Sequence, residues 1–112
     1  MESLERELRR GTLELLLLRI LADEPTYGYE LLSRLGKRSG GRFHIKEGTL
    51  YPVLYRMENR GWIKGRWVEK PGERQRCFYK LTAEGRRVLA QKKKNWNEYI
   101  AAVNSIVGAS NA

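Results

Sequence analysis

The segment that decides the fold spans residues 47–63, with the sequence EGTLYPVLYRMENRGWI. Its apolar residues recur at the helical spacing i, i+3, i+4 and i+7, at Leu50, Val53, Leu54 and Met57. Gly61 is suited to end such a helix, because glycine readily adopts the left-handed conformation that often follows a helix C-terminus. The spacing predicts a helix over about 47–60, and we expect its regular part to start near Thr49, which would place Pro52 in the first turn.

The opposite face of this helix is small, aromatic and polar, with little acid. Such a face suits the major groove of DNA, where arginine can read guanine, asparagine can read adenine and aromatic edges can contact thymine methyl groups. The alternative is an ordinary solvated helix face. As candidate recognition-helix contacts we name Thr49, Tyr51, Pro52, Tyr55, Arg56 and Asn59.

Two runs rich in aromatic and β-branched residues follow, at 62–69 and 76–81, and they are separated by KPGERQ. A Pro-Gly turn between two such runs predicts a β-hairpin. Strand alternation would turn one set of its side chains inward: Ile63, Trp67, Cys77, Tyr79 and Leu81. Basic residues dominate the rest of the hairpin, and strand tips of this kind can reach the phosphate backbone or the minor groove. The candidate wing and phosphate contacts are Lys64, Arg66, Lys70, Arg74 and Arg76.

Helical patterns flank this unit on both sides. We expect a helix over about 4–22 that Pro25 ends, a second over about 27–38 with Thr26 as its N-cap, and a long final helix capped by Thr82. The fold class is therefore α+β, mostly α: a winged helix-turn-helix with a long C-terminal dimerisation helix. We assign residues 1–81 to a winged-helix DNA-binding domain, whose first helix also reaches the dimer interface, and residues 82–112 to the dimerisation helix.

The apolar stripe of the last helix extends beyond what a small core could cover. A homodimer in which the first and last helices of two protomers pack together would bury it, and its two-fold axis would place the two reading helices about 34 Å apart, one turn of DNA. A monomer with this helix folded back is the alternative. The candidate dimerisation residues are Leu8, Leu16, Leu89, Trp96, Tyr99, Ile100, Val103 and Val107.

The charge distribution favours an anionic partner. The chain has 112 residues, a formal charge of +9 and a pI of about 10.0. Residues 34–94 alone have a net charge of +13, and the two ends on either side of them are mildly acidic. One His and one Cys offer neither a catalytic triad nor a zinc site, so we expect no enzyme, no cofactor and no metal. The longest apolar run is too short to span a membrane, and we expect a cytoplasmic protein.

Three motifs in register resemble the PadR family of bacterial transcriptional regulators. They are the segment 47–63, YGYEL at 27–31 and RCFYKLTAEG at 76–85. The resemblance implies a winged-helix DNA-binding domain with Tyr51, Tyr55 and Arg56 on or beside the reading helix. It also implies phosphate contacts for the wing residues Lys70, Arg74 and Arg76.

The C-terminus, one helix long, is similar to that of the family's smaller subgroup, whose members are dimeric repressors. In some of these, planar hydrophobic compounds bind between the paired C-terminal helices against a tryptophan, which makes Trp96 the candidate effector-binding residue. The lysines at 92–94 would favour an anionic aromatic compound over a cationic one.

Together these features predict a sequence-specific DNA-binding regulator that acts as a homodimeric repressor on a palindromic operator and is released by a small aromatic effector. The expected partners are double-stranded DNA, a second copy of the chain and that effector. The alternative is a basic winged-helix adaptor that binds RNA or a protein without reading a DNA sequence.

Overall fold

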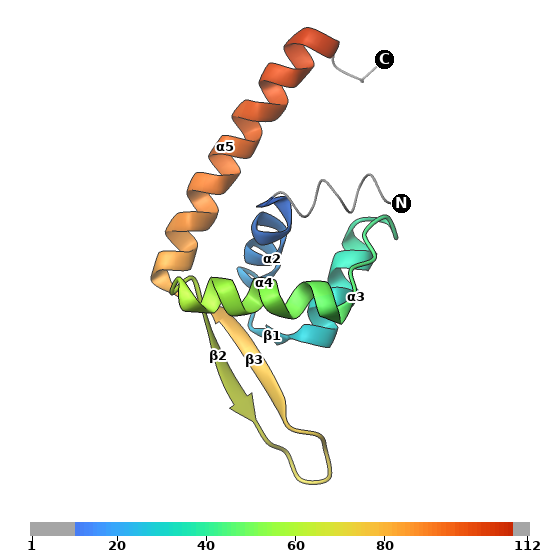
Figure 1. Ribbon diagram of the computed structural model, residues 1–112, viewed down its shortest axis with the longest axis vertical. Coiled ribbons are helices and arrows are strands. Elements are labelled where there is room, and N and C mark those ends of the chain that lie inside the picture. The colour runs from blue at the N-terminus through green and yellow to red at the C-terminus, as the bar shows by residue number, and fades with distance from the viewer. Residues whose placement is uncertain (1–10, 109–112) are drawn as a thin grey trace.

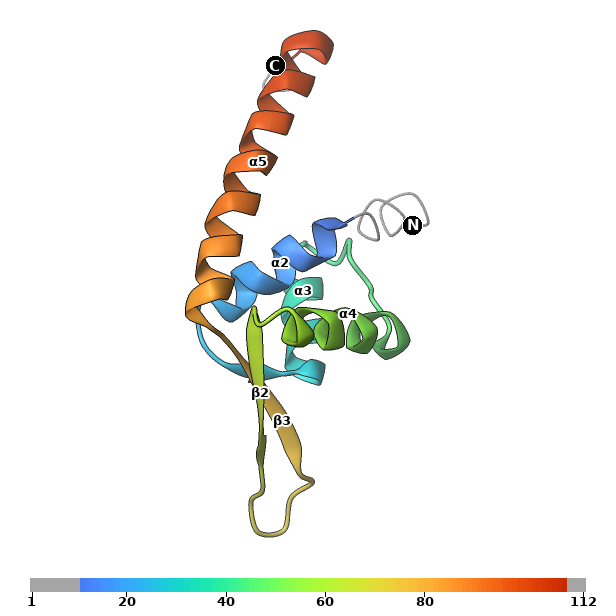
Figure 2. The ribbon, with the colours of Figure 1, turned by 60° about the vertical axis from the view of Figure 1, so that its left-hand side comes forward.

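The computed structural model describes residues 11–108 (Figure 1). The elements follow one another as α2 (Leu13–Leu21), β1 (Thr26–Tyr27), α3 (Gly28–Arg38), α4 (Glu47–Asn59), β2 (Ile63–Val68), β3 (Arg76–Leu81) and α5 (Ala83–Val107). The three shorter helices gather in the middle, while the hairpin of β2 and β3 and the helix α5 extend from them in opposite directions (Figures 1 and 2). This arrangement confirms the predicted winged helix with a long C-terminal helix.

The core lies between α2, α3 and α4 and is closed by the base of the hairpin. Its buried members are Leu13, Leu17, Leu18, Ile20, Leu21, Leu31, Leu35, Leu50, Val53, Leu54, Met57, Ile63 and Leu81. All four apolar residues that predicted α4 are among them: Leu50, Val53, Leu54 and Met57. The described part of the first helix is buried on more than one side, as its wide apolar stripe indicates.

The ends of α4 follow from two local arrangements. Its C-terminus has both Schellman hydrogen bonds, because Gly61 has φ 78° and donates to the Glu58 carbonyl at 2.9 Å, while Trp62 donates to the Met57 carbonyl at 3.0 Å. The regular helix already starts at Glu47, so the expected start near Thr49 is wrong and Pro52 lies in the helix interior. The hydrogen bond that Pro52 cannot donate would run to the exposed Gly48, where water can satisfy the carbonyl.

A third strand was not predicted. The sheet has the order β1-β3-β2, and β1 pairs with β3 through Thr26 opposite Tyr79 and Tyr27 opposite Phe78. Thr26 is thus a buried strand residue, and its prediction as the N-cap of α3 is wrong, because that helix begins two residues later at Gly28. A strand of two residues is too short to show a hydrophobic period.

The hairpin and the cap of α5 form as predicted. At the tip, Glu73 donates to the Lys70 carbonyl at 3.0 Å and Gly72 has φ 77°, which are features of a type II turn with Pro71 at its second position. Thr82 accepts a hydrogen bond from the Gly85 amide at 3.0 Å and so caps the helix that projects away from the core.

Candidate nucleic-acid interface

The outer face of α4 carries most of the predicted reading residues. Tyr51, Pro52, Tyr55, Arg56 and Asn59 are all exposed along it. Thr49 is half-buried and lies at the edge of this face, in a hollow between α4 and the start of α2. The helix therefore offers solvent a hydroxyl, guanidinium and amide surface of the kind that reads base edges.

Tyr51 is positioned by a close approach to α3. Its hydroxyl occupies the space beside Gly28, where an added Cβ would lie 2.2 Å from the Tyr51 oxygen. This contact gives a physical reason for the glycine in the YGYEL motif. Burial raises the pKa of the Tyr51 phenol, and burial also raises the pKa of the Tyr79 phenol nearby.

Glu58 is an acidic residue of α4 with a structural partner on the hairpin. Its carboxylate accepts a hydrogen bond from the Gly65 amide at 2.9 Å, and so it fastens β2 to α4. A Cβ at Gly65 would lie 2.8 Å from the Cys77 sulfur and 3.2 Å from the Glu58 oxygen, so only glycine allows this approach. This role of Glu58 was not predicted, because no local pattern in the sequence pairs Glu58 with the hairpin.

An aromatic and basic hollow of about 610 Å³ lies between the wing and the N-terminal ends of α3 and α4. Among the side chains that line it are Tyr29, Tyr51, Trp67, Arg74 and Arg76. Tyr29 is 68% exposed and Trp67 is 65% exposed. Tyr29 was not predicted as a site residue. The prediction that Trp67 points into the core is wrong, because β2 continues past the end of the core at that position.

The acid in this hollow is Glu47, which lies in the first turn of α4, where a carboxylate stabilises the helix N-terminus. On the wing side, the guanidinium of Arg76 lies over the Tyr27 ring, 4.5 Å from its centroid, and Tyr27 in turn meets Phe78 edge to face at 5.2 Å. The aromatic pair therefore fixes the direction of one wing cation. Lys70 and Arg74 are exposed at the tip.

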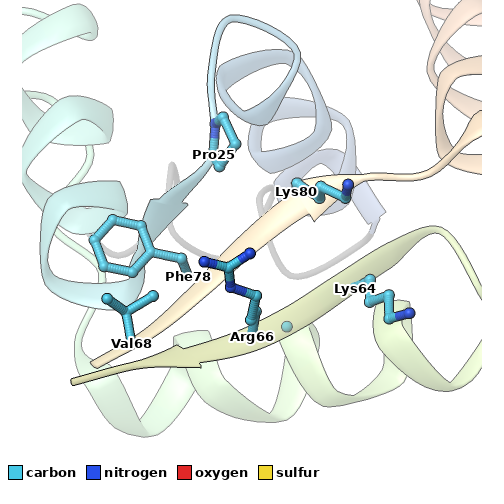
Figure 3. A pocket seen from close by; sticks show the side chains of 7 residues that line it. Pro25, Lys64, Arg66, Val68, Phe78 and Lys80 are labelled. Carbon is cyan, nitrogen blue, oxygen red and sulfur yellow. The ribbon is translucent and has the colours of Figure 1, made fainter. Parts of the chain in front are cut away.

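The predicted wing cations fall into two groups. The missing side chain of Gly65 would point toward α4, so the neighbouring Lys64 and Arg66 point to the other face of the sheet. Figure 3 shows them around a second hollow of about 440 Å³, together with Phe78 and Lys80. Lys64 lies directly opposite Lys80 in the register. Lys70 and Arg74 lie at the tip. Arg76 lines the α4 hollow, but it pairs with Val68 in the register, so its side chain leaves the strand on the same face as Lys64 and Arg66 and reaches the Tyr27 ring.

The predicted dimerisation residues lie in two environments. Leu16 and Leu89 are half-buried and pack against the core. Farther along α5, the apolar stripe is much more open: Trp96 is 40%, Tyr99 62% and Val107 77% exposed, whereas Ile100 and Val103 are half-buried. Leu8 lies outside the described residues.

A smaller hollow of about 260 Å³ separates α5 from the start of α2. Its lining includes Thr12, Leu15, Lys92, Trp96 and Tyr99, so the candidate effector residue lies at a shallow, open depression. Within residues 11–108, we find neither a cluster of three or more metal-ligating side chains nor a helix that is long and apolar enough to cross a membrane.

The three-helix unit, the paired wing and the projecting α5 define the class of winged-helix regulators with a C-terminal helical arm. The family model described as "Transcriptional regulator PadR-like family" matches residues 17–91, about two thirds of the chain. The chain therefore belongs to the PadR-like family of transcriptional regulators, which are not enzymes.

Individual relatives agree with this assignment. Transcriptional regulator Rv3488 of Mycobacterium tuberculosis is 30% identical over 93 residues, which cover 83% of each chain. The crystal structure of a PadR family transcriptional regulator from Eggerthella lenta is similar with a TM-score of 0.82 and 35% identity, over 97% of this chain and 93% of that one. A transcriptional regulator from Clostridium thermocellum is similar with a TM-score of 0.82 and 30% identity, over 90% and 98% of the two chains.

Proposed function

We propose that the protein is a homodimeric repressor that reads a palindromic DNA operator. The observation that carries this proposal is the exposed face of α4 with Tyr55, Arg56 and Asn59, together with a basic wing that an open hollow separates from the N-terminal end of α4. In the proposed complex α4 enters the major groove, and these three side chains, with Thr49, Tyr51 and Pro52 around them, choose the sequence.

The wing supplies affinity in this proposal. Lys70, Arg74 and Arg76 contact phosphates, and Trp67 lines the hollow through which the backbone would pass. Lys64 and Arg66 point away from α4, so we assign them to the long-range attraction of DNA rather than to a contact beside the reading helix.

In this proposal the arm α5 forms the interface of the symmetric dimer. Its apolar stripe of Trp96, Tyr99, Ile100, Val103 and Val107 would pack against the first and last helices of a second copy, which would set the separation of the two α4 helices. We further propose that the hollow beside Trp96 takes a small aromatic effector, and that Lys92 in its lining favours an anionic one.

Binding to duplexes at physiological salt tests the proposal against the adaptor alternative. We expect the protein to bind a fragment of its own promoter at least about a thousandfold more tightly than a random duplex. Equal affinity for the two duplexes, or tighter binding of a structured RNA, would favour the adaptor.

The salt dependence of binding should change when Arg74 is replaced by alanine. Each neutralised phosphate contributes about −0.9 to the slope of log affinity against log salt concentration, so Arg74→Ala should make the slope shallower by about one unit. Its sequence preference should stay the same. Fluorescence anisotropy titrations at several salt concentrations measure the slope.

The matched control is Asn59→Ala on the exposed face of α4. This variant should lose preference at one position of each half-site, by about 1–3 kcal/mol, and should keep the wild-type salt slope. If Arg74→Ala kept the wild-type slope, the wing would make no phosphate contact.

A further inference from the structure

Glu14 connects three helices through a single carboxylate. It lies on α2, and its side chain is only 12% exposed. One of its oxygens is 3.4 Å from a guanidinium nitrogen of Arg60, which caps the C-terminus of α4. The other oxygen is 3.6 Å from the ammonium nitrogen of Lys92 on α5. The C-terminal end of α4 and the first half of α5 therefore meet at this one group.

The same two cations also share an aromatic ring. Arg60 lies 5.1 Å and Lys92 lies 5.5 Å from the centroid of Trp62. Trp62 closes the C-terminus of α4 through its amide, which donates to the Met57 carbonyl. A displacement of either cation therefore changes the surroundings of the residue that ends the reading helix.

Lys92 has a second environment as well. It lines the hollow between α2 and α5, together with Trp96 and Tyr99. An anion in that hollow would offer Lys92 a partner other than Glu14. A carboxylate that is largely removed from water needs nearby cations to stabilise its charge. The loss of Lys92 would leave Arg60 as the remaining cationic partner of Glu14 among the described residues.

We propose that Glu14 is the positioning residue through which an organic anion in the α2/α5 hollow controls the placement of the reading helix. The anion draws Lys92 away from Glu14 and Trp62, and α5 loses its ionic link to α2 and to the end of α4. This inference rests on the proposed function, in which α5 sets the separation of the two reading helices. Because the half-sites of a palindrome have a fixed spacing, a dimer whose α5 helices are released binds the operator more weakly. DNA in turn weakens binding of the anion by the same factor.

The three tryptophans allow a direct test, because they lie in three different places. Trp96 lies in the hollow, Trp62 beside Arg60 and Lys92, and Trp67 on the wing. In the ¹⁵N-labelled full chain, 1-naphthoate should shift the indole N–H resonances of Trp96 and Trp62 but not that of Trp67. The neutral probe 1-naphthylmethanol should shift Trp96 alone.

Operator binding supplies the second readout. Saturating 1-naphthoate should weaken wild-type operator binding about fivefold or more. In Glu14→Gln the probe should still shift Trp96, but its effect on the operator affinity should fall to less than about twofold. In Lys92→Met both the Trp62 response and the coupling should disappear.

Glu84→Gln is the matched control, because Glu84 pairs with Arg87 on the exposed surface of the same helix, and it should keep the full coupling. The inference would be overturned if 1-naphthoate did not shift the Trp62 resonance, or if 1-naphthoate weakened operator binding by Glu14→Gln as much as it weakens binding by the wild type. A wild-type protein that prefers no duplex would instead contradict the proposed function.

Discussion

Replacing Gly85 by alanine should destabilise the whole fold, with a loss of about 3 kcal/mol in the free energy of unfolding. An added Cβ would lie 2.0 Å from the Trp62 carbonyl oxygen and 3.0 Å from a methyl group of Leu81. The carbonyl cannot move away freely, because it accepts the Thr82 amide at 3.1 Å and belongs to the turn that ends α4. Urea denaturation followed by circular dichroism measures the loss.

Gly36→Ala is the control for this substitution. Gly36 lies inside α3, and the nearest atom to its added Cβ is the Phe43 carbonyl oxygen at 3.7 Å, an ordinary contact. Because alanine is the better helix former, this variant should be as stable as the wild type or more stable, by up to about 1 kcal/mol. Similar losses in both variants would mean that helix α5 does not approach the Trp62 carbonyl closely.

Val103→Glu should separate the dimer into monomers. Val103 lies on the apolar stripe of α5, and a carboxylate there would be buried against the second copy without a partner. Because two linked half-site contacts would become one, operator affinity should fall about a hundredfold or more. Sedimentation at micromolar concentration and anisotropy with the operator measure the two effects.

Ser105→Glu is the matched control, since Ser105 is exposed and lies on the opposite side of the same helix by its 100° spacing. It should remain dimeric and bind the operator as the wild type does. A Val103→Glu variant that stays dimeric would place the interface elsewhere, and the separation of the reading helices would then need another cause.

Local sequence patterns predicted most of this architecture, because each element carries its own period or cap. The stripe of Leu50, Val53, Leu54 and Met57 predicted the buried side of α4, and Thr82 predicted the start of α5. The hairpin followed from two β-rich runs around Pro71 and Gly72. Each of these signals lies within the element that it describes.

The features that escaped prediction depend on contacts between distant residues. Strand β1 exists because Thr26 and Tyr27 pair with residues about fifty positions later. Glu14 interrupts an apolar helix in the sequence, and its partners, Arg60 and Lys92, come from two other elements. The division of the wing cations between two faces likewise depends on how Gly65 packs against Glu58. None of these contacts leaves a period in the local sequence.

Selection of binding sites from a random duplex library tests the central claim most directly. The proposed function predicts strong enrichment of a palindrome whose half-site centres lie about one helical turn apart, 10–10.5 base pairs, because the two-fold axis would place two copies of α4 in successive major grooves. Recovery of duplexes with no common sequence, or of a single asymmetric site, would contradict the proposal of a symmetric DNA-reading dimer.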